Sequence, residues 1–150
     1  MLKLSESVYN ALRKHGEETY PHECCGVLLG RSQDDTNTVE DAVPAGNTRT
    51  DSAHNRYHIA PQELMRIQRQ GRERGLDIVG FYHSHPDHPA QWSKTDFAEA
   101  HWLSCSYVIT AVAKGAAEQT NSFLLTGTNE EDKAFQDEPI QVEQLVAERC

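Results

Sequence analysis

Apolar side chains recur at helical spacing in three stretches of the chain. The first runs from Ser5 to about Glu18, with Ser5 in the position of an N-cap. The second begins at Pro61, a residue favoured at the first helical position, and ends at Gly75. The third runs from Ser93 to about Leu103. The pattern therefore predicts three helices well separated in sequence.

Short apolar runs bounded by turn residues predict the strands. Cys24 to Gly30 is typical of a buried strand, and a polar turn at 33–37 joins it to a second strand over Thr38 to Val43, which indicates a hairpin. Ile78 to Tyr82 is the most strand-like run. Further strands are expected over Tyr107–Val112, Ser122–Leu125 and Pro139–Val142, with a short edge strand over Arg56–Ile59.

Two polar segments without periodicity are expected to be connections. Pro44 to Asn55 forms a long predicted loop, and loops of this length in compact domains are often functional. Asn129 to Glu138 is charged and is predicted to be a second connection. Because hairpins are mixed with single helices and no steady strand–helix alternation occurs, we expect an α+β fold in one domain over residues 1–150.

Composition narrows the classes of partner. The chain carries a formal charge of −9 and has no basic cluster, so nucleic acid is not an expected partner. No apolar run approaches the ~20 residues of a membrane span, so no membrane association is expected. The cysteines include an adjacent pair, Cys24 and Cys25, but no Cys-x-x-Cys motif. Reduced thiols in a cytoplasmic protein are therefore expected.

His83 and His85 follow directly on the most strand-like run. Side chains alternate along a strand, so both imidazoles project from one face while Ser84 points to the other. If Ser93 caps the next helix, Asp96 lies in its first turn. Two imidazoles, one carboxylate and an open position for water form a catalytic zinc site rather than a closed structural one.

Each of these signals also has an ordinary explanation. Ser-x-x-Asp is a common capping box, and most isolated His-x-His pairs bind no metal. Cys25 could offer a soft thiolate to the metal, although a buried strand thiol is the simpler interpretation. Four other histidines lack a partner at convincing spacing and are interpreted as ordinary polar side chains: His54, His58, His88 and His101.

Two motifs resemble a known family. The segment from His83 to Asp96 fits the His-Ser/Thr-His-x7-Ser-x-x-Asp signature of the JAMM metalloproteases, the catalytic members of the MPN domain family. The segment from Pro21 to Gly30 resembles the family's Pro-x-Glu-x-Cys-Gly-x-Leu-x-Gly motif, which carries the catalytic Glu. The resemblance extends from about Leu4 to Gly127 and is strongest to the compact prokaryotic members.

The resemblance implies a set of roles. His83, His85 and Asp96 would bind one Zn²⁺ per chain, Glu23 would be the general acid/base, and Ser93 would donate a hydrogen bond to the oxyanion. It also implies an MPN-like fold, with a curved mixed sheet flanked by about three helices. The expected reaction is hydrolysis of a peptide or isopeptide bond after the C-terminal Gly-Gly of a ubiquitin-like or sulfur-carrier protein.

Several points stay open at this level. Many relatives have Pro where this chain has Trp92, which either walls the substrate groove or packs on the domain. The segment 44–59 is expected to supply a free strand edge for a Gly-Gly tail. A zinc amidohydrolase acting on a small amide and a non-catalytic MPN scaffold are the alternative functions. The oligomeric state is undetermined, with a homodimer as one option.

Overall fold

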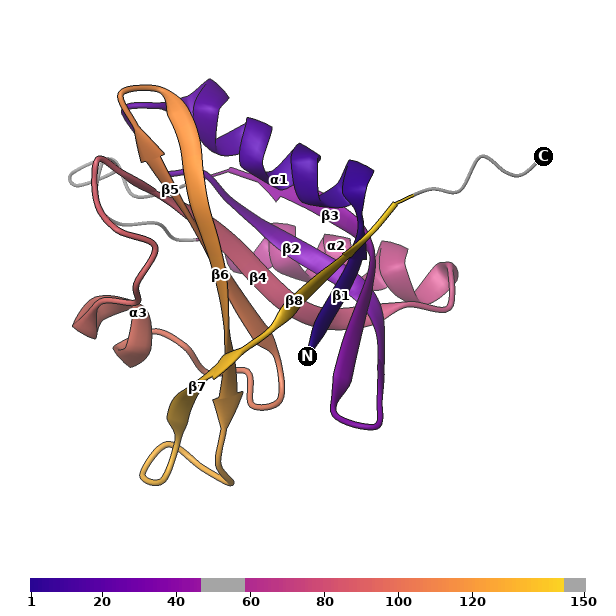
Figure 1. Ribbon diagram of the computed structural model, residues 1–150. Coiled ribbons are helices and arrows are strands. Elements are labelled where there is room, and N and C mark those ends of the chain that lie inside the picture. Colours follow the sequence, from indigo (N-terminus) through magenta and orange to yellow (C-terminus); the bar gives the residue numbers. More distant parts are fainter. Residues whose placement is uncertain (47–58, 145–150) are drawn as a thin grey trace.

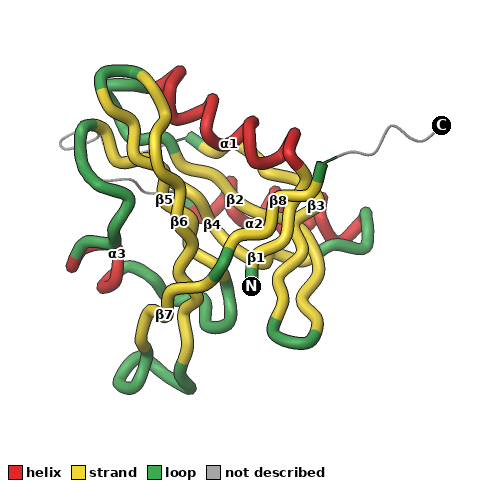
Figure 2. The backbone as a smooth tube through the Cα atoms, viewed as in Figure 1, coloured by secondary structure: helices red, strands yellow, loops and turns green. Residues whose placement is uncertain are grey.

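The computed structural model describes residues 1–46 and 59–144. Its eight strands form one mixed sheet in the order β7-β6-β5-β4-β2-β3-β1-β8, with three helices packed around it (Figures 1 and 2). The elements are β1 (Leu2–Ser5), α1 (Glu6–Thr19), β2 (Cys25–Gln33), β3 (Thr36–Ala45), α2 (Pro61–Glu73), β4 (Asp77–Pro86), α3 (Lys94–Ala98), β5 (Ser106–Ala113), β6 (Ala116–Thr126), β7 (Ala134–Glu138) and β8 (Ile140–Glu143).

The two edge strands of the sheet, β7 and β8, are consecutive in sequence. β7 pairs antiparallel with β6, with Leu125 opposite Phe135, and β8 pairs parallel with β1, with Leu2 opposite Ile140. Because only Pro139 separates β7 from β8, the sheet curls until its two edges approach each other (Figure 1). The strands thus form a nearly closed mixed sheet, in agreement with the predicted α+β class.

Each face of the sheet has its own apolar core. α1 packs on one face, where Leu12 and Leu28 belong to one buried cluster with residues of β1 and β4. α2 packs on the other face, where Ile67 joins Val27 and Phe81. Because side chains alternate along β2, Leu28 faces α1, while Val27 and Leu29 on either side of it face α2. The central strands are therefore covered on both sides and provide a rigid base for side chains at their ends.

Most predicted elements are confirmed. α1 follows an N-cap at Ser5, whose side chain accepts from the amide of Val8. α2 begins at Pro61 and ends at Glu73, close to the predicted Gly75. β2 and β3 pair antiparallel as the expected hairpin. β4 extends the expected strand through both histidines to Pro86.

Four expectations need correction. The third helix is a single short segment that ends at Ala98, rather than continuing to Leu103. Part of the expected connection at 129–138 is β7, because Phe135 and its neighbours pair with β6. β3 continues to Ala45, inside the expected loop, and β1 was not foreseen. Residues 56–58 of the expected edge strand lie outside the described residues, and Ile59 is in no strand.

None of the helices within the described ranges combines the length and apolar character needed to cross a membrane.

Candidate metal centre

β4 carries both histidines on the same face at its carboxyl end. His83 is 2% exposed and His85 is 9% exposed, so both rings are held by packing. Ser84, fully buried between them, faces α1, as the alternation of a strand requires. β4 lies between β2 and β5, which fixes its backbone from both sides.

Asp96 reaches the same point from the connection between β4 and β5. The Ser93 hydroxyl accepts from the Asp96 amide at 3.0 Å, and the Ser93 amide donates to Asp96 Oδ2 at 2.9 Å. This reciprocal capping box starts α3 and holds the Asp96 carboxylate beside the helix N-terminus. Both of the roles suggested for Ser-x-x-Asp, capping and orienting the carboxylate, are therefore compatible.

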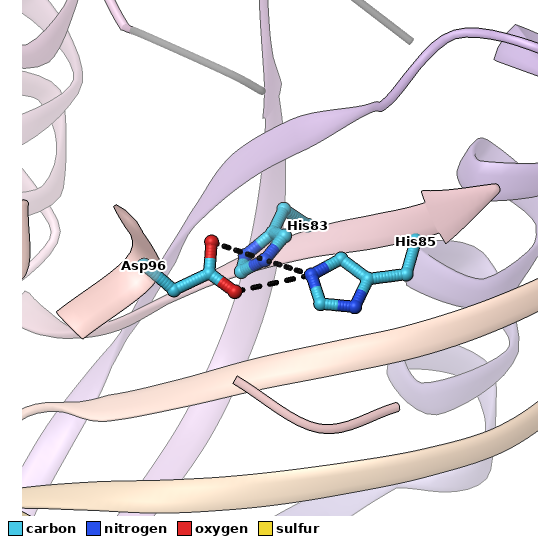
Figure 3. Close-up of side chains that lie close together, drawn as sticks. All are labelled: His83, His85 and Asp96. Carbon is cyan, nitrogen blue, oxygen red and sulfur yellow. Dashed lines mark hydrogen bonds and ion pairs between the residues drawn. The ribbon is translucent and has the colours of Figure 1, made fainter. Parts of the chain in front are cut away.

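The three side chains converge on one point (Figure 3). His85 Nε2 lies 3.1 Å from His83 Nε2 and 3.1 Å from Asp96 Oδ2, and His83 Nε2 lies 3.3 Å from Asp96 Oδ1. Ligands placed tetrahedrally at ~2.0–2.1 Å from zinc are themselves about 3.3 Å apart. The spacing and the two-nitrogen, one-oxygen donor set therefore fit a zinc ion. Among the residues that the structure describes, His83, His85 and Asp96 form the one group of three His, Cys, Asp or Glu side chains placed closely enough to hold a metal ion.

Hydrogen bonding orients the His85 ring. Its Nδ1 lies 2.9 Å from the carbonyl oxygen of Pro89. A carbonyl oxygen can only accept, so Nδ1 carries the proton, and the unprotonated Nε2 faces His83 Nε2 and the Asp96 carboxylate. Burial lowers the pKa of His85, but the hydrogen bonds with Asp96 and Pro89 outweigh burial and the net shift is upward. Burial lowers the pKa of His83, which favours the neutral ring that a metal requires.

Asp96 stays ionised in this arrangement. Burial alone would raise its pKa, but the two histidines and the Ser93 amide outweigh burial and hold the pKa well below its usual range. The cluster thus offers one anionic oxygen and two imidazole nitrogens.

Glu23 lies just before β2 and is only 4% exposed. A Glu at the start of an apolar strand is usually solvated, so its burial could not be expected from sequence alone. Burial raises the pKa of Glu23 to about 8, with His85 opposing the rise and Asp96 adding to it. Both of these residues belong to the metal-ligand cluster, so Glu23 and the cluster share one electrostatic environment.

Other residues weighed in the sequence lie elsewhere. Trp92 packs against Phe97 and Phe135, with ring centroids 5.5 and 5.3 Å apart, so it packs on the domain although 39% exposed. The Cys25 thiol is fully buried and donates weakly to backbone carbonyls 3.8 Å away. His101 pairs with Glu130 at the surface. His88 is exposed, and His54 and His58 lie outside the described residues.

Three supporting contacts were not foreseen. Pro89, in the connection between β4 and α3, orients His85 through its carbonyl. Lys133 donates to the carbonyls that follow Asp96, and Ser84 accepts from the amide of Cys24. The last two join segments distant in sequence, so no local motif marks them.

The chain belongs to the family of prokaryotic homologs of the JAB domain, whose profile matches residues 5–126. It is 36% identical over 104 residues to the desampylase of Haloferax volcanii, covering 69% of this chain and 73% of that protein. It is 25% identical over 142 residues to the CysO-cysteine peptidase of Mycobacterium tuberculosis, covering 95% and 91%. The predicted family and the prediction of a peptidase-type hydrolase are confirmed.

Solved structures support the same fold. A protein of Desulfitobacterium hafniense solved in solution superposes with a TM-score of 0.80 at 27% identity, covering 96% of this chain and 94% of that one. A JAB1/MPN domain protein from Archaeoglobus fulgidus superposes with a TM-score of 0.55 at 12% identity, covering 95% and 96%. The second likeness concerns the fold alone, and it confirms the MPN-like architecture.

Proposed function

We propose that this protein is a zinc peptidase that hydrolyses the bond after the C-terminal Gly-Gly of a ubiquitin-like or sulfur-carrier protein. The observation that carries the proposal is the convergence of His83, His85 and Asp96 at 3.1–3.3 Å beside the buried carboxyl of Glu23. The three converging residues would hold the ion. A zinc ion supplies Lewis acidity and lowers the pKa of its water to ~7 when bound.

Glu23 is the proposed general acid/base. A proton carrier works best when its pKa lies near the working pH, and burial raises the pKa of Glu23 to about 8. Glu23 would accept a proton from the attacking water and return it to the leaving amine. The same carboxyl then serves both halves of the reaction.

Ser93 is the proposed oxyanion donor. Its oxygen accepts the Asp96 amide at 3.0 Å, and the hydroxyl keeps its own hydrogen as a donor. The capping box fixes the hydroxyl in place before substrate arrives. A fixed donor aimed at a developing oxyanion stabilises the transition state by a few kcal/mol.

The names of the relatives support the substrate class. Desampylase and CysO-cysteine peptidase are names of enzymes that act on conjugates of ubiquitin-like or sulfur-carrier proteins, and the Gly-Gly tail is part of the proposal. A tail without side chains requires a narrow channel and main-chain contacts for recognition. The alternative, a small-amide hydrolase, would use the same residues. The scaffold alternative is disfavoured because all five site residues are present.

A cleavage assay tests the proposal. Ubiquitin-like and sulfur-carrier proteins ending in Gly-Gly are given a C-terminal extension, or are linked to a lysine side chain, and are incubated with zinc-loaded protein. We expect release of the extension by wild type. Glu23→Gln should keep about one zinc per chain and turn over at least ~100-fold more slowly.

The controls separate the alternatives. Replacing the last Gly of the tail by Val should abolish cleavage, because the side chain blocks a narrow channel. A glycyl-cysteine dipeptide hydrolysed as efficiently as the tailed proteins would favour the small-amide hydrolase. Full activity after removal of the metal by a chelator would contradict the proposal.

A further inference from the structure

Ser84 lies between the two histidines but faces away from them, towards α1. The ladder of β2 and β4 ends at the pair of Cys25 with His83. Beyond it, Cys24 and Ser84 are joined by one backbone hydrogen bond and one side-chain hydrogen bond. The Ser84 amide donates to the Cys24 carbonyl at 3.3 Å, and the Cys24 amide donates to Ser84 Oγ at 2.8 Å. One residue thus binds both backbone polar groups of Cys24, and its side chain supplies the shorter bond.

The Cys24 amide belongs to the same rigid plane as the Glu23 carbonyl. A peptide unit is planar and joins the Cα atoms of two neighbouring residues. The bond to Ser84 Oγ therefore fixes the peptide plane on which the Glu23 Cα sits. Glu23 itself precedes β2, beyond the last pair of the β2–β4 ladder, so this bond extends the rigidity of the sheet to it.

The Ser84 hydroxyl is itself held tightly. Ser84 is fully buried, and Cys24 is 2% exposed, so water does not replace either partner. α1 closes over this point at Gly16, where an added Cβ would lie 3.1 Å from Ser84 Cβ. The hydroxyl thus occupies a small enclosed space between a helix and two strands. Such a buried bond has one geometry and is costly to leave unmade.

We infer that Ser84 is a positioning residue that couples the metal-ligand strand to the general acid/base. It touches neither substrate nor metal. It acts through the peptide plane of Glu23, so that the carboxyl keeps its distance from His83 and His85. This inference rests on the proposed function where it concerns turnover, but the coupling of Ser84 to Cys24 is a property of the chain alone.

Amide exchange tests the coupling without any activity. In Ser84→Ala we expect the Cys24 amide, followed by NMR in the full chain, to exchange at least 10-fold faster, while the amide of Val27, inside β2, is unchanged. Ser84→Thr keeps the hydroxyl and should restore slow exchange. Ser106→Ala is the matched control, because it also removes a fully buried strand hydroxyl, bonded to Asn37. An unchanged Cys24 amide in Ser84→Ala would overturn the inference.

Kinetics test whether the coupling serves catalysis. We expect Ser84→Ala to bind zinc within ~3-fold of wild type, to keep KM within ~3-fold, and to lose 10- to 100-fold in kcat. In single turnovers with Glu23→Gln, adding Ser84→Ala should cost less than 3-fold, because the group it positions is gone. An equal loss in both backgrounds would overturn the positioning role. If wild type cleaves no tailed protein, the proposed function fails, and amide exchange alone decides the coupling.

Discussion

Glu23 combines a titratable group with an environment that resists its charge. Its pKa of about 8 in the folded chain lies above the value of 4.5 for an unperturbed Glu. Between these values the folded chain binds more protons than the unfolded chain, so the free energy of unfolding falls as pH rises. The residue that would carry the proton in turnover is therefore a source of instability in the metal-free protein.

Glu23→Gln should reverse this instability. Because Gln does not ionise, we expect chelator-treated Glu23→Gln to match wild type near pH 5 and to be more stable by about 4 kcal/mol at pH 8. Urea unfolding at pH 5, 6.5 and 8 measures the difference. Glu118→Gln, at an exposed carboxyl, controls for the loss of one negative charge. A stability difference independent of pH would contradict this account of Glu23.

Gly26 permits a close approach between β2 and an aromatic ring of β4. A Cβ at this position would overlap the Tyr82 ring, whose hydroxyl is fixed 2.8 Å from His15 Nδ1. The ring cannot move without breaking this partly buried contact. We expect Gly26→Ala to lower the free energy of unfolding by about 3 kcal/mol, measured by chemical denaturation. Gly46→Ala, where the added Cβ meets only a side chain at 3.7 Å, should change it by less than about 1 kcal/mol.

α3 is shorter than its sequence pattern predicts, and a distant lysine binds one carbonyl inside the helix and one just beyond its end. Lys133 Nζ donates to the carbonyls of Phe97 and Ala100 at 3.0 and 2.8 Å and pairs with Glu130 at 2.8 Å. Its side chain is 5% exposed. Because Phe97 follows Asp96 directly, this lysine also steadies the helix turn that carries the carboxylate.

Lys133→Met should therefore weaken metal binding without touching a ligand. We expect about a 10-fold loss of zinc affinity, in the range seen when groups supporting a metal ligand are removed, measured by competition with a chromophoric chelator. Lys94→Met is the matched control, because Lys94 lies in the same helix but is exposed, and it should keep wild-type affinity. Equal affinity in Lys133→Met would show that α3 is held by other contacts.

The elements that sequence predicts well are those with local signals. Ser5 and Pro61 mark helix starts, and the apolar run before His83 marks a strand that places two histidines on one face. What sequence could not show depends on long-range partners. Phe135 is a single aromatic in a polar segment, and this segment forms strand β7 only because β6 is available to pair with it. The burial of Glu23 likewise depends on segments far from it.

At the scale of the whole molecule, the candidate centre joins two elements, β4 and α3, that residues 87–93 separate along the chain. β4 and the start of α3 are separated by a bend, and an ion bound to both would stabilise the folded state by mass action. We expect a chelator to lower the stability of zinc-saturated protein by about 4 kcal/mol at a thousandfold excess over Kd.

That loss corresponds to a fall in Tm of roughly 10 °C for a chain of this size, and added zinc should restore it. Differential scanning fluorimetry measures both changes. Asp96→Asn removes the anionic ligand, and its Tm should respond to neither reagent. A wild-type Tm that ignores both would mean that no ion links β4 to α3.

The seam between β1 and β8 has a consequence for the order in which the molecule assembles and opens. Leu2 meets Ile140 there, so the pairing closes a loop of nearly the whole described chain, which is the costliest kind of contact to form early. The pairing of β1 with β8 should therefore form late in folding and open early in unfolding. His83 and His85 of β4 lie near the middle of the sheet, with three strands between β4 and β8 on one side and two between β4 and β7 on the other, so the edge strands can fray while these two histidines stay in register.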